Sequence, residues 1–265
     1  FTTARLAWTR WELEMAGDRA TRLQAVNALG SRTLPPGGVV ESDRAWLAVG
    51  PTRGALLMDW VRRTGLEMDS RVPRRGAATW SQVRRNDRLQ DLQPDGIQVI
   101  EGQTETEVPG YRSRLARARE RLESGALLVA SGAPFAASVG LADARGADGN
   151  APPGAGDLDL AFTTQRLWLL APGPLRVADG SIAEAQTRAS IAGLAGGLLT
   201  LADDIDTLSD ERFAILQRIL PPLAREANAP LAKGMLVTPL VGGRLAVLLL
   251  NPGEKRADLA LPFRV

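Results

Sequence analysis

The stretch SIAEAQTRASIAGLAGGLLTL, residues 181–201, shows how this chain alternates between helix and strand. The apolar spacing of residues 181–194 predicts a helix, and residues 197–201 predict a strand directly after it. Residues 166–170 predict a further strand before this helix. Strands that alternate with helices are typical of parallel sheets, so we expect an α/β fold.

The same alternation begins near Pro94 and continues to Pro222. The predicted elements are a strand at 97–100, a charged helix at 111–123, a buried strand at 126–130, a loop rich in Gly, Ala and Pro at 140–156, and a last helix with Ser209 as N-cap and Pro221 as its stop. The glycines of residues 193–197 predict close packing between a helix and a strand.

The two ends of the chain predict antiparallel β structure. Residues 1 to about 50 contain short mixed segments, the turn Leu34-Pro-Pro-Gly-Gly38 and another predicted strand at 39–49. A helix at 54–64 follows, with Gly65 placed as its C-cap. Near the other end, apolar runs at 235–240, 245–250 and 257–263 are separated by turn residues, which predicts a small antiparallel sheet.

The composition excludes several kinds of chemistry. The chain of 265 residues has no Cys and no His, and its only tyrosine is Tyr111. It therefore has no disulfide, no Cys/His zinc site and no catalytic triad that uses histidine. Catalysis by this chain would depend on carboxylates, Arg, Lys, hydroxyl groups or a metal bound through oxygen.

Charge and hydropathy limit the partners. All but two of the 32 basic residues are arginine, and the formal net charge is only +2. The arginines mostly lie beside acidic residues, which favours a mixed-charge surface and no nucleic-acid partner. No apolar run reaches the ~18 residues of a membrane span, and the chain begins without the pattern of a signal peptide. We therefore expect a soluble, cytoplasmic protein with no membrane partner.

Several stretches, in order along the chain, resemble one family. The most specific is ASIAGLAGGLLTLADDIDTLSDER, residues 189–212, which continues to Leu220-Pro-Pro222. LVASGAPFAASVGL at 128–141, RLWLL at 166–170 and residues 33–80 add to it. Together they resemble the melibiase-type α-galactosidases of glycoside hydrolase family 36. Residues 189–222 look like the last barrel strand and following helix of that family, and residues 33–80 look like the end of its N-terminal β-domain.

The resemblance implies a (β/α)8 barrel, but residues 94–202 supply only about four strand candidates. We therefore expect a partial or reduced (β/α) barrel at residues 51–222. An N-terminal β segment at 1–50 and a C-terminal antiparallel β-sheet at 223–265 would flank it. Since a reduced barrel leaves strand edges open, we also expect self-association into a homo-oligomer.

The resemblance further implies a retaining hydrolase of α-galactosides that uses two carboxylates and no cofactor. The family's nucleophile lies in a Lys-x-Asp motif, and no Lys occurs before Lys233. Arg145 and Ala151-Pro152 match the frame of the family's acid/base motif, which puts Gly149 at the acid position and Asp148 one residue before it. Asp148 is therefore the candidate acid.

Other polar motifs of the family are altered. Glu101 is the one carboxylate of Ile100-Glu-Gly102, where the family has Asp-Asp-Gly, and Ala171-Pro-Gly173 stands in place of Asp-Pro-Asp. Glu101 or Asp204 would supply the second carboxylate. We expect a glycoside hydrolase with impaired or absent activity. The alternative is a non-catalytic remnant that binds carbohydrate or serves as a structural or interaction module.

Four residues are candidates for binding the sugar. Trp80 and Trp168 have aromatic faces that suit the apolar side of a sugar, with core packing as the alternative for both. Arg145 would orient a carboxylate or a sugar hydroxyl, with a surface loop position as the alternative. Asp203 follows a predicted strand, where barrel loops form active sites.

The motif Asp203-Asp204-Ile-Asp206 has two interpretations. Its carboxylates would bind sugar hydroxyls or a divalent cation through oxygen. The alternative is a solvated loop in which Asp206 or Ser209 caps the next helix. We assign no metal site.

Overall fold

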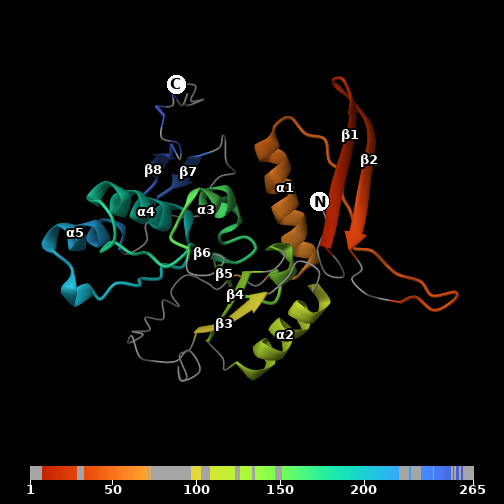
Figure 1. Ribbon diagram of the computed structural model, residues 1–265, viewed down its shortest axis with the longest axis horizontal. Helices are drawn as coiled ribbons and strands as arrows, with labels where there is room; N and C mark the ends of the chain where they lie inside the picture. The colour runs from red at the N-terminus through yellow and green to blue at the C-terminus, as the bar shows by residue number, and fades with distance from the viewer. Residues whose placement is uncertain are drawn as a thin grey trace. The chain divides into compact units, whose positions relative to one another are not determined.

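The computed structural model describes residues 8–28, 33–70, 97–102, 108–122, 126–132, 135–146, 151–220, 234–240 and 242–251, with isolated positions at 72, 227, 253, 255, 256 and 258. These residues form a mixed α/β fold of five α-helices and three small sheets, and they do not show a closed barrel (Figure 1). The chain divides into two compact units, Phe1–Val49 with Arg63–Arg145 and Gly50–Arg62 with Gly146–Val265. None of the helices in the described ranges is both long and apolar enough to cross a membrane.

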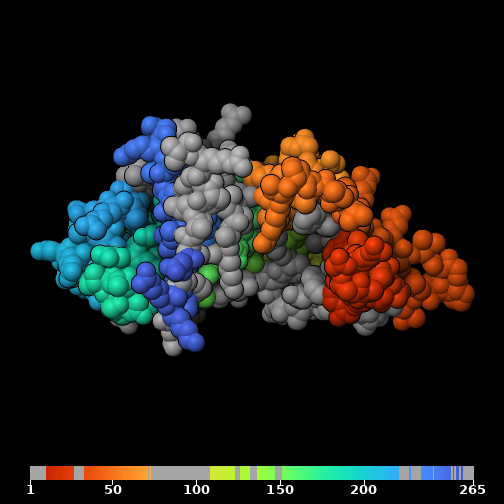
Figure 2. Space-filling view, turned by 90° about the horizontal axis from the view of Figure 1, so that it is seen from above, coloured from red at the N-terminus to blue at the C-terminus, as the bar shows by residue number. Residues whose placement is uncertain are grey.

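The first unit begins with an antiparallel hairpin of β1 (Trp8–Ala16) and β2 (Arg19–Ala28), which confirms β structure near the N-terminus. Leu13 pairs with Leu23, and Glu14 pairs with Arg22, whose guanidinium lies 3.3 Å from the Glu14 carboxylate. Since neighbouring positions of a strand face opposite sides, the hairpin has one apolar face and one charged face. In the space-filling view the hairpin is drawn in red (Figure 2).

Residues 39–49 do not form the strand that their sequence predicts. The turn before them is confirmed, because the backbone N–H of Gly38 donates to the carbonyl of Pro35 at 2.8 Å. Within residues 39–49, only Ala45 makes a β-bridge. Val39 and Val49 have exposed side chains, so this apolar pattern has no sheet to pack into.

Helix α1 (Arg53–Glu67) confirms the predicted helix but continues past Gly65. The backbone N–H of Met68 donates to the carbonyl of Thr64 at 2.9 Å, and that of Ser70 donates to the carbonyl of Gly65 at 2.8 Å. Asp69 has a φ of 52°, the left-handed conformation that often ends a helix. The prediction of Gly65 as C-cap is wrong because Asp69 takes that conformation instead.

The strand–helix–strand pattern is confirmed in the first unit. β3 (Ile97–Gly102), α2 (Val108–Arg121) and β4 (Leu127–Gly132) follow one another, and the two strands are parallel. β5 (Ala144–Gly146) pairs in parallel with β4 as well. The predicted loop at 140–156 therefore contains a short strand, which its Gly-rich composition concealed.

Helix α2 covers this sheet and closes the core of the first unit (Figure 1). Its buried residues recur every three or four positions, so one stripe of the helix faces the strands. The core residues are Val108, Tyr111, Leu115, Ala118, Leu128, Ala130, Ala137 and Ala142.

The second unit confirms the two later predicted helices. Its elements are α3 (Ala155–Leu160), β6 (Leu169–Ala171), α4 (Ile182–Ala195), α5 (Asp210–Ile219), β7 (Met235–Pro239) and β8 (Leu245–Leu249). The Ser181 hydroxyl accepts a hydrogen bond from the N–H of Glu184 at 3.2 Å, and the Glu184 carboxylate accepts one from the N–H of Ser181 at 2.7 Å. This capping box starts α4, and Ser209 caps α5 as predicted.

Residues 197–201 do not form a regular strand, so that prediction is wrong. A single parallel bridge joins Leu175 to Leu201. Pro172, which precedes this segment's partner Leu175, has no N–H to donate. Its ring also packs tightly against Gly196, because a Cβ added at Gly196 would lie 2.5 Å from the Pro172 Cδ atom. The prediction of close packing against a strand at 193–197 is confirmed by Gly197, where a Cβ would lie 3.0 Å from Cδ2 of Leu169 in β6. Gly193 packs against a helix instead, because a Cβ there would lie 3.0 Å from Ile219 of α5.

The C-terminal sheet is confirmed for two of its three predicted runs. β7 and β8 are antiparallel, with Val237 opposite Val247. Leu236 of β7 and Leu248 of β8 pack into a core cluster with residues of α4. The third run, 257–263, lies largely outside the described residues.

Candidate functional site

The carboxyl ends of the parallel strands in the first unit carry two of the predicted residues. The register pairs Glu101 of β3 with Ser131 of β4, and it pairs Arg145 of β5 with Ala130. In this register, Arg145 is therefore aligned one residue earlier along the strands than Glu101. The side chain of Glu101 lies outside what the structure describes.

Arg145 is buried at the edge of β4. Its Nη1 donates to the carbonyl of Ala130 at 3.3 Å. Arg145 lies on the same face of the sheet as Leu128 and Ala130, which pack against α2. The structure therefore places Arg145 among internal contacts, and the alternative of a surface loop position is wrong because Arg145 is buried in β5.

Sequence reasoning missed the role of Tyr111. Its buried hydroxyl donates to the carbonyl of Ser131 at 3.1 Å, which ties α2 to the carboxyl end of β4. The Arg114 guanidinium lies 5.8 Å from the centroid of the Tyr111 ring, within the range of a cation–π contact. The sequence signal that could have indicated this role is that Tyr111 is the only tyrosine of the chain and lies on a predicted helix.

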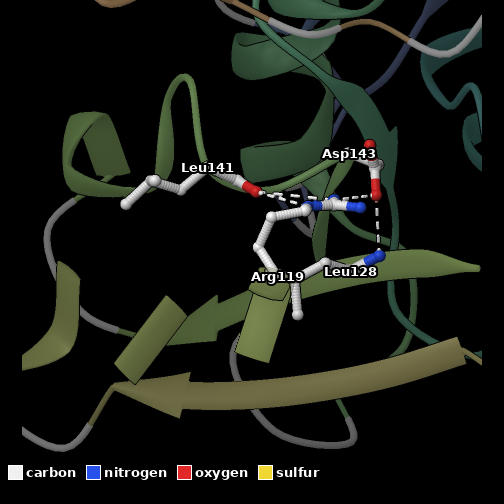
Figure 3. Close-up of polar contacts among 4 residues, drawn as sticks. All are labelled: Arg119, Leu128, Leu141 and Asp143. Atoms are coloured by element: carbon white, nitrogen blue, oxygen red, sulfur yellow. Dashed lines mark hydrogen bonds and ion pairs between the residues drawn. The ribbon is translucent and has the colours of Figure 1, made fainter. Parts of the chain in front are cut away.

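A second polar cluster lies near the amino end of β4 (Figure 3). The Asp143 carboxylate forms an ion pair with Arg119 and accepts the backbone N–H of Leu128 at 2.8 Å. Arg119 also donates to the carbonyl of Leu141 at 3.4 Å. These contacts join α2, β4 and the segment before β5, so they stabilise the fold rather than face the carboxyl ends of the strands.

In the second unit, Asp203 holds a loop. Its carboxylate accepts the backbone N–H groups of Val177 at 2.5 Å and Ala178 at 3.4 Å. Arg212 donates to the carbonyls of Val177 and Gly180 in the same loop. Both carboxylate oxygens of Asp203 thus serve the protein's own backbone.

Asp204 behaves as the capping alternative predicts. Its exposed carboxylate accepts the N–H of Asp206 at 3.2 Å and caps the short 3-10 helix Ile205–Thr207. Ser209 caps the next helix, α5, as this alternative predicts, whereas the cap that Asp204 supplies to the 3-10 helix before it was not predicted. Within the described ranges, no group of three acidic residues is placed to hold a metal ion.

Trp168 and Gly173 are both enclosed within the second unit. The Trp168 side chain has an exposed fraction of 0%, so the core-packing alternative holds for it. A Cβ at Gly173 would lie 1.5 Å from the carbonyl oxygen of Ala151. No side chain fits at the position where the resemblance expects an aspartate. Asp148 and Trp80 lie outside the described residues.

A scan against protein-family models and a search of curated proteins both find no match to this sequence.

Proposed function

We propose that this chain is an α-galactosidase-like glycoside hydrolase whose hydrolytic activity is impaired or absent. Support for the α-galactosidase-like part comes from residues 189–222 and from the order of β3, β4 and β5. These strands are parallel and are neighbours in the order of the chain, as in a (β/α) barrel. Their carboxyl ends are where barrel enzymes hold their reacting groups.

The observation that carries the impairment is the close approach of Ala151 to Gly173. A retaining hydrolase needs two carboxylates about 5 Å apart. Position 173 is neither of these two, but the resemblance expects a further aspartate there, and the backbone of Ala151 fills the space that its side chain would need. The nucleophile motif is also missing from the sequence, so residual chemistry would rest on Asp148 as acid and on Glu101 or Asp204 as the second carboxylate.

The second candidate is a non-catalytic carbohydrate-binding or structural module. Arg145, Trp168 and Asp203 are all engaged or enclosed within the protein. Substitution of these residues would therefore lower stability rather than change affinity for a sugar.

An aryl α-galactoside assay tests the proposal. We would compare the unmodified chain with Asp148→Ala and with Asp179→Ala, a control at an exposed loop position. We expect turnover near background, far below the typical enzyme range of about 1–1000 per second. Turnover within that range would contradict the impairment. Residual turnover that is lost in Asp148→Ala but kept in the control would assign the acid, and turnover unchanged in both would remove that assignment.

Calorimetry separates the two non-catalytic roles. Heat on titration with galactose, together with a change in Trp fluorescence, would support carbohydrate binding. The absence of heat with galactose and other common sugars would leave the structural or interaction role.

A further inference from the structure

Asp179 and Gly180 form an Asp-Gly pair in the loop before helix α4, and both residues are exposed. The side-chain carboxyl carbon of an aspartate can be attacked by the backbone nitrogen of the next residue, which closes a succinimide ring. A side chain on that next residue hinders the attack, and glycine has none. This pair therefore has the residue types that favour conversion of aspartate to isoaspartate.

The fold requires glycine at the second position of the pair. Gly180 has a φ of 74°, the left-handed conformation that side chains disfavour, and a Cβ added there would lie 2.5 Å from the Glu184 carboxylate. That carboxylate also accepts the N–H of Ser181 at 2.7 Å, in the capping box that starts α4. The residue that least hinders the attack is thus the residue that the start of α4 needs.

Both reacting groups of the pair are accessible to each other. Within the described part of the chain, no hydrogen bond or ion pair engages the Asp179 carboxylate or the Gly180 N–H. The neighbouring N–H groups of Val177 and Ala178 differ, because both donate to the Asp203 carboxylate. Asp179 can therefore turn its side chain toward the Gly180 nitrogen without losing a hydrogen bond of its own.

Arg188 lies where it assists the attack. Its guanidinium donates to the backbone carbonyl of Asp179 at 3.3 Å. This carbonyl belongs to the same peptide group as the Gly180 N–H, so its oxygen shares the negative charge that develops when the nitrogen loses its proton. A hydrogen bond from a cation to that oxygen stabilises the charge, and the attacking form of the nitrogen is favoured.

We propose that Asp179 is a site of spontaneous isomerisation to isoaspartate in the folded chain. In the first step the Gly180 nitrogen loses its proton and bonds to Cγ of Asp179, whose hydroxyl group leaves as water. In the second step water adds to the backbone carbonyl carbon of Asp179, and the bond from this carbon to the Gly180 nitrogen breaks. The product is joined to Gly180 through its side-chain carbonyl and has a free backbone carboxylate. The water lost in the first step is regained in the second, so the reaction needs no other reactant.

The product changes the start of α4, because isoaspartate inserts a methylene group into the backbone before Gly180. The carbonyl of Gly180 accepts a hydrogen bond from Arg212 at 2.7 Å, and Ser181 directly after it forms the capping box with Glu184. A longer backbone displaces both residues from these partners. Loss of the cap should lower the midpoint of thermal unfolding by about 2–4 °C.

Peptide mapping tests the site directly. Trypsin should release residues 177–188, in which Asp179 is the only aspartate and no asparagine occurs. After prolonged incubation of the folded chain at physiological temperature and pH, the isoaspartyl peptide should elute as a separate peak of unchanged mass, and electron-transfer fragmentation should identify it. In water enriched in heavy oxygen, this product should gain one heavy oxygen atom.

Asp258 is the control within the same molecule. Its side chain is 94% exposed, a leucine follows it in the sequence, and trypsin should release it in the separate peptide 257–264. We expect isoaspartate to form at Asp179 about tenfold faster than at Asp258 or more, a difference in barrier of about 1.4 kcal/mol. Equal rates at the two sites would overturn the proposal.

A synthetic peptide of residues 177–188 separates the effect of the fold from that of the local sequence. We expect the folded chain to isomerise at a rate comparable to that of the peptide, because the reacting groups are exposed and Arg188 contacts the peptide group. Isomerisation in the peptide alone would overturn the proposal, since the fold would then protect the pair.

Two variants complete the test. Asp179→Asn should form the same isoaspartyl peptide faster, because ammonia replaces water as the leaving group. Asp179→Glu keeps the charge but would have to close a larger ring, so no isomer peak should appear in it. Incubated Asp179→Glu should also keep its unfolding midpoint, although the Asp-Gly pairs that begin at Asp95 and Asp148 are unchanged in it. A fall in midpoint equal to that of the unmodified chain would exclude Asp179 as the cause.

Discussion

Replacement of Gly140 by alanine should destabilise the first unit. Gly140 has a φ of 79°, a left-handed conformation that costs other residues about 1–2 kcal/mol. A Cβ there would also lie 1.8 Å from the carbonyl oxygen of Met68, which follows helix α1. Backbone atoms must move apart by roughly 1 Å or more to accept it, in an interior packed as densely as a crystal.

We expect Gly140→Ala to lower the free energy of unfolding by about 4 kcal/mol or more, a large fraction of the ~5–15 kcal/mol of a typical domain. Gly37→Ala is the matched control. Gly37 has the same φ of 79° in the same unit, but no atom lies within 4 Å of its added Cβ. The control should therefore lose only the conformational cost of about 1–2 kcal/mol.

Urea unfolding followed by circular dichroism measures both variants. The difference between them isolates the clash with Met68 from the conformational cost that they share. Equal losses in the two variants would show that residue 140 does not approach Met68 as closely as this structure has it.

Three further changes test other contacts. Thr64→Val should raise the free energy of unfolding by about 1 kcal/mol in urea, because the Thr64 hydroxyl is fully buried and has no hydrogen-bond partner among the described residues; a loss would contradict this. Asp143→Asn should lower it by about 1.5–3 kcal/mol in the same assay, whereas Asp59→Asn, at an exposed pair with Arg62, should cost less than about 1 kcal/mol; similar losses would count against the cluster. Hydrogen bonds from Ser181, first from its backbone N–H, lower the pKa of Glu184 below 4.5. The unmodified chain should therefore be more stable than Glu184→Gln by the full amount at neutral pH, and this difference should shrink as the pH falls below 4.5. Thermal unfolding measures it, and a difference in stability that does not change with pH would exclude this.

Much of the fold could be predicted because its signals are local. Helices α2, α4 and α5 follow apolar stripes, and Ser209 is a hydroxyl placed where an orphan N–H needs an acceptor. β4 is a short apolar run, which is typical of a strand between helices. The predicted strand at 39–49 failed because its apolar ends, Val39 and Val49, are exposed and pack against no sheet within the described residues.

The candidate site was less predictable. Asp203 and Arg145 have the residue types of sugar-binding groups, but hydrogen-bonding capacity does not specify the partner. The Val177 and Ala178 amides that Asp203 binds lie some 25 residues earlier in the chain. Asp204 was ambiguous for the same reason, since a carboxylate at a strand end serves equally as a cap and as a ligand.

The amino-acid sequence alone was sufficient for the α/β class, most helices, the paired strands β7 and β8 and the exclusion of histidine and cysteine chemistry. These properties depend on composition and on spacing within a few residues. The enclosure of Trp168, the contact of Gly173 with Ala151 and the use of Asp203 to hold a loop required the tertiary structure. Each depends on which distant segments meet, and the free energy of such contacts is shared among residues that no local pattern connects.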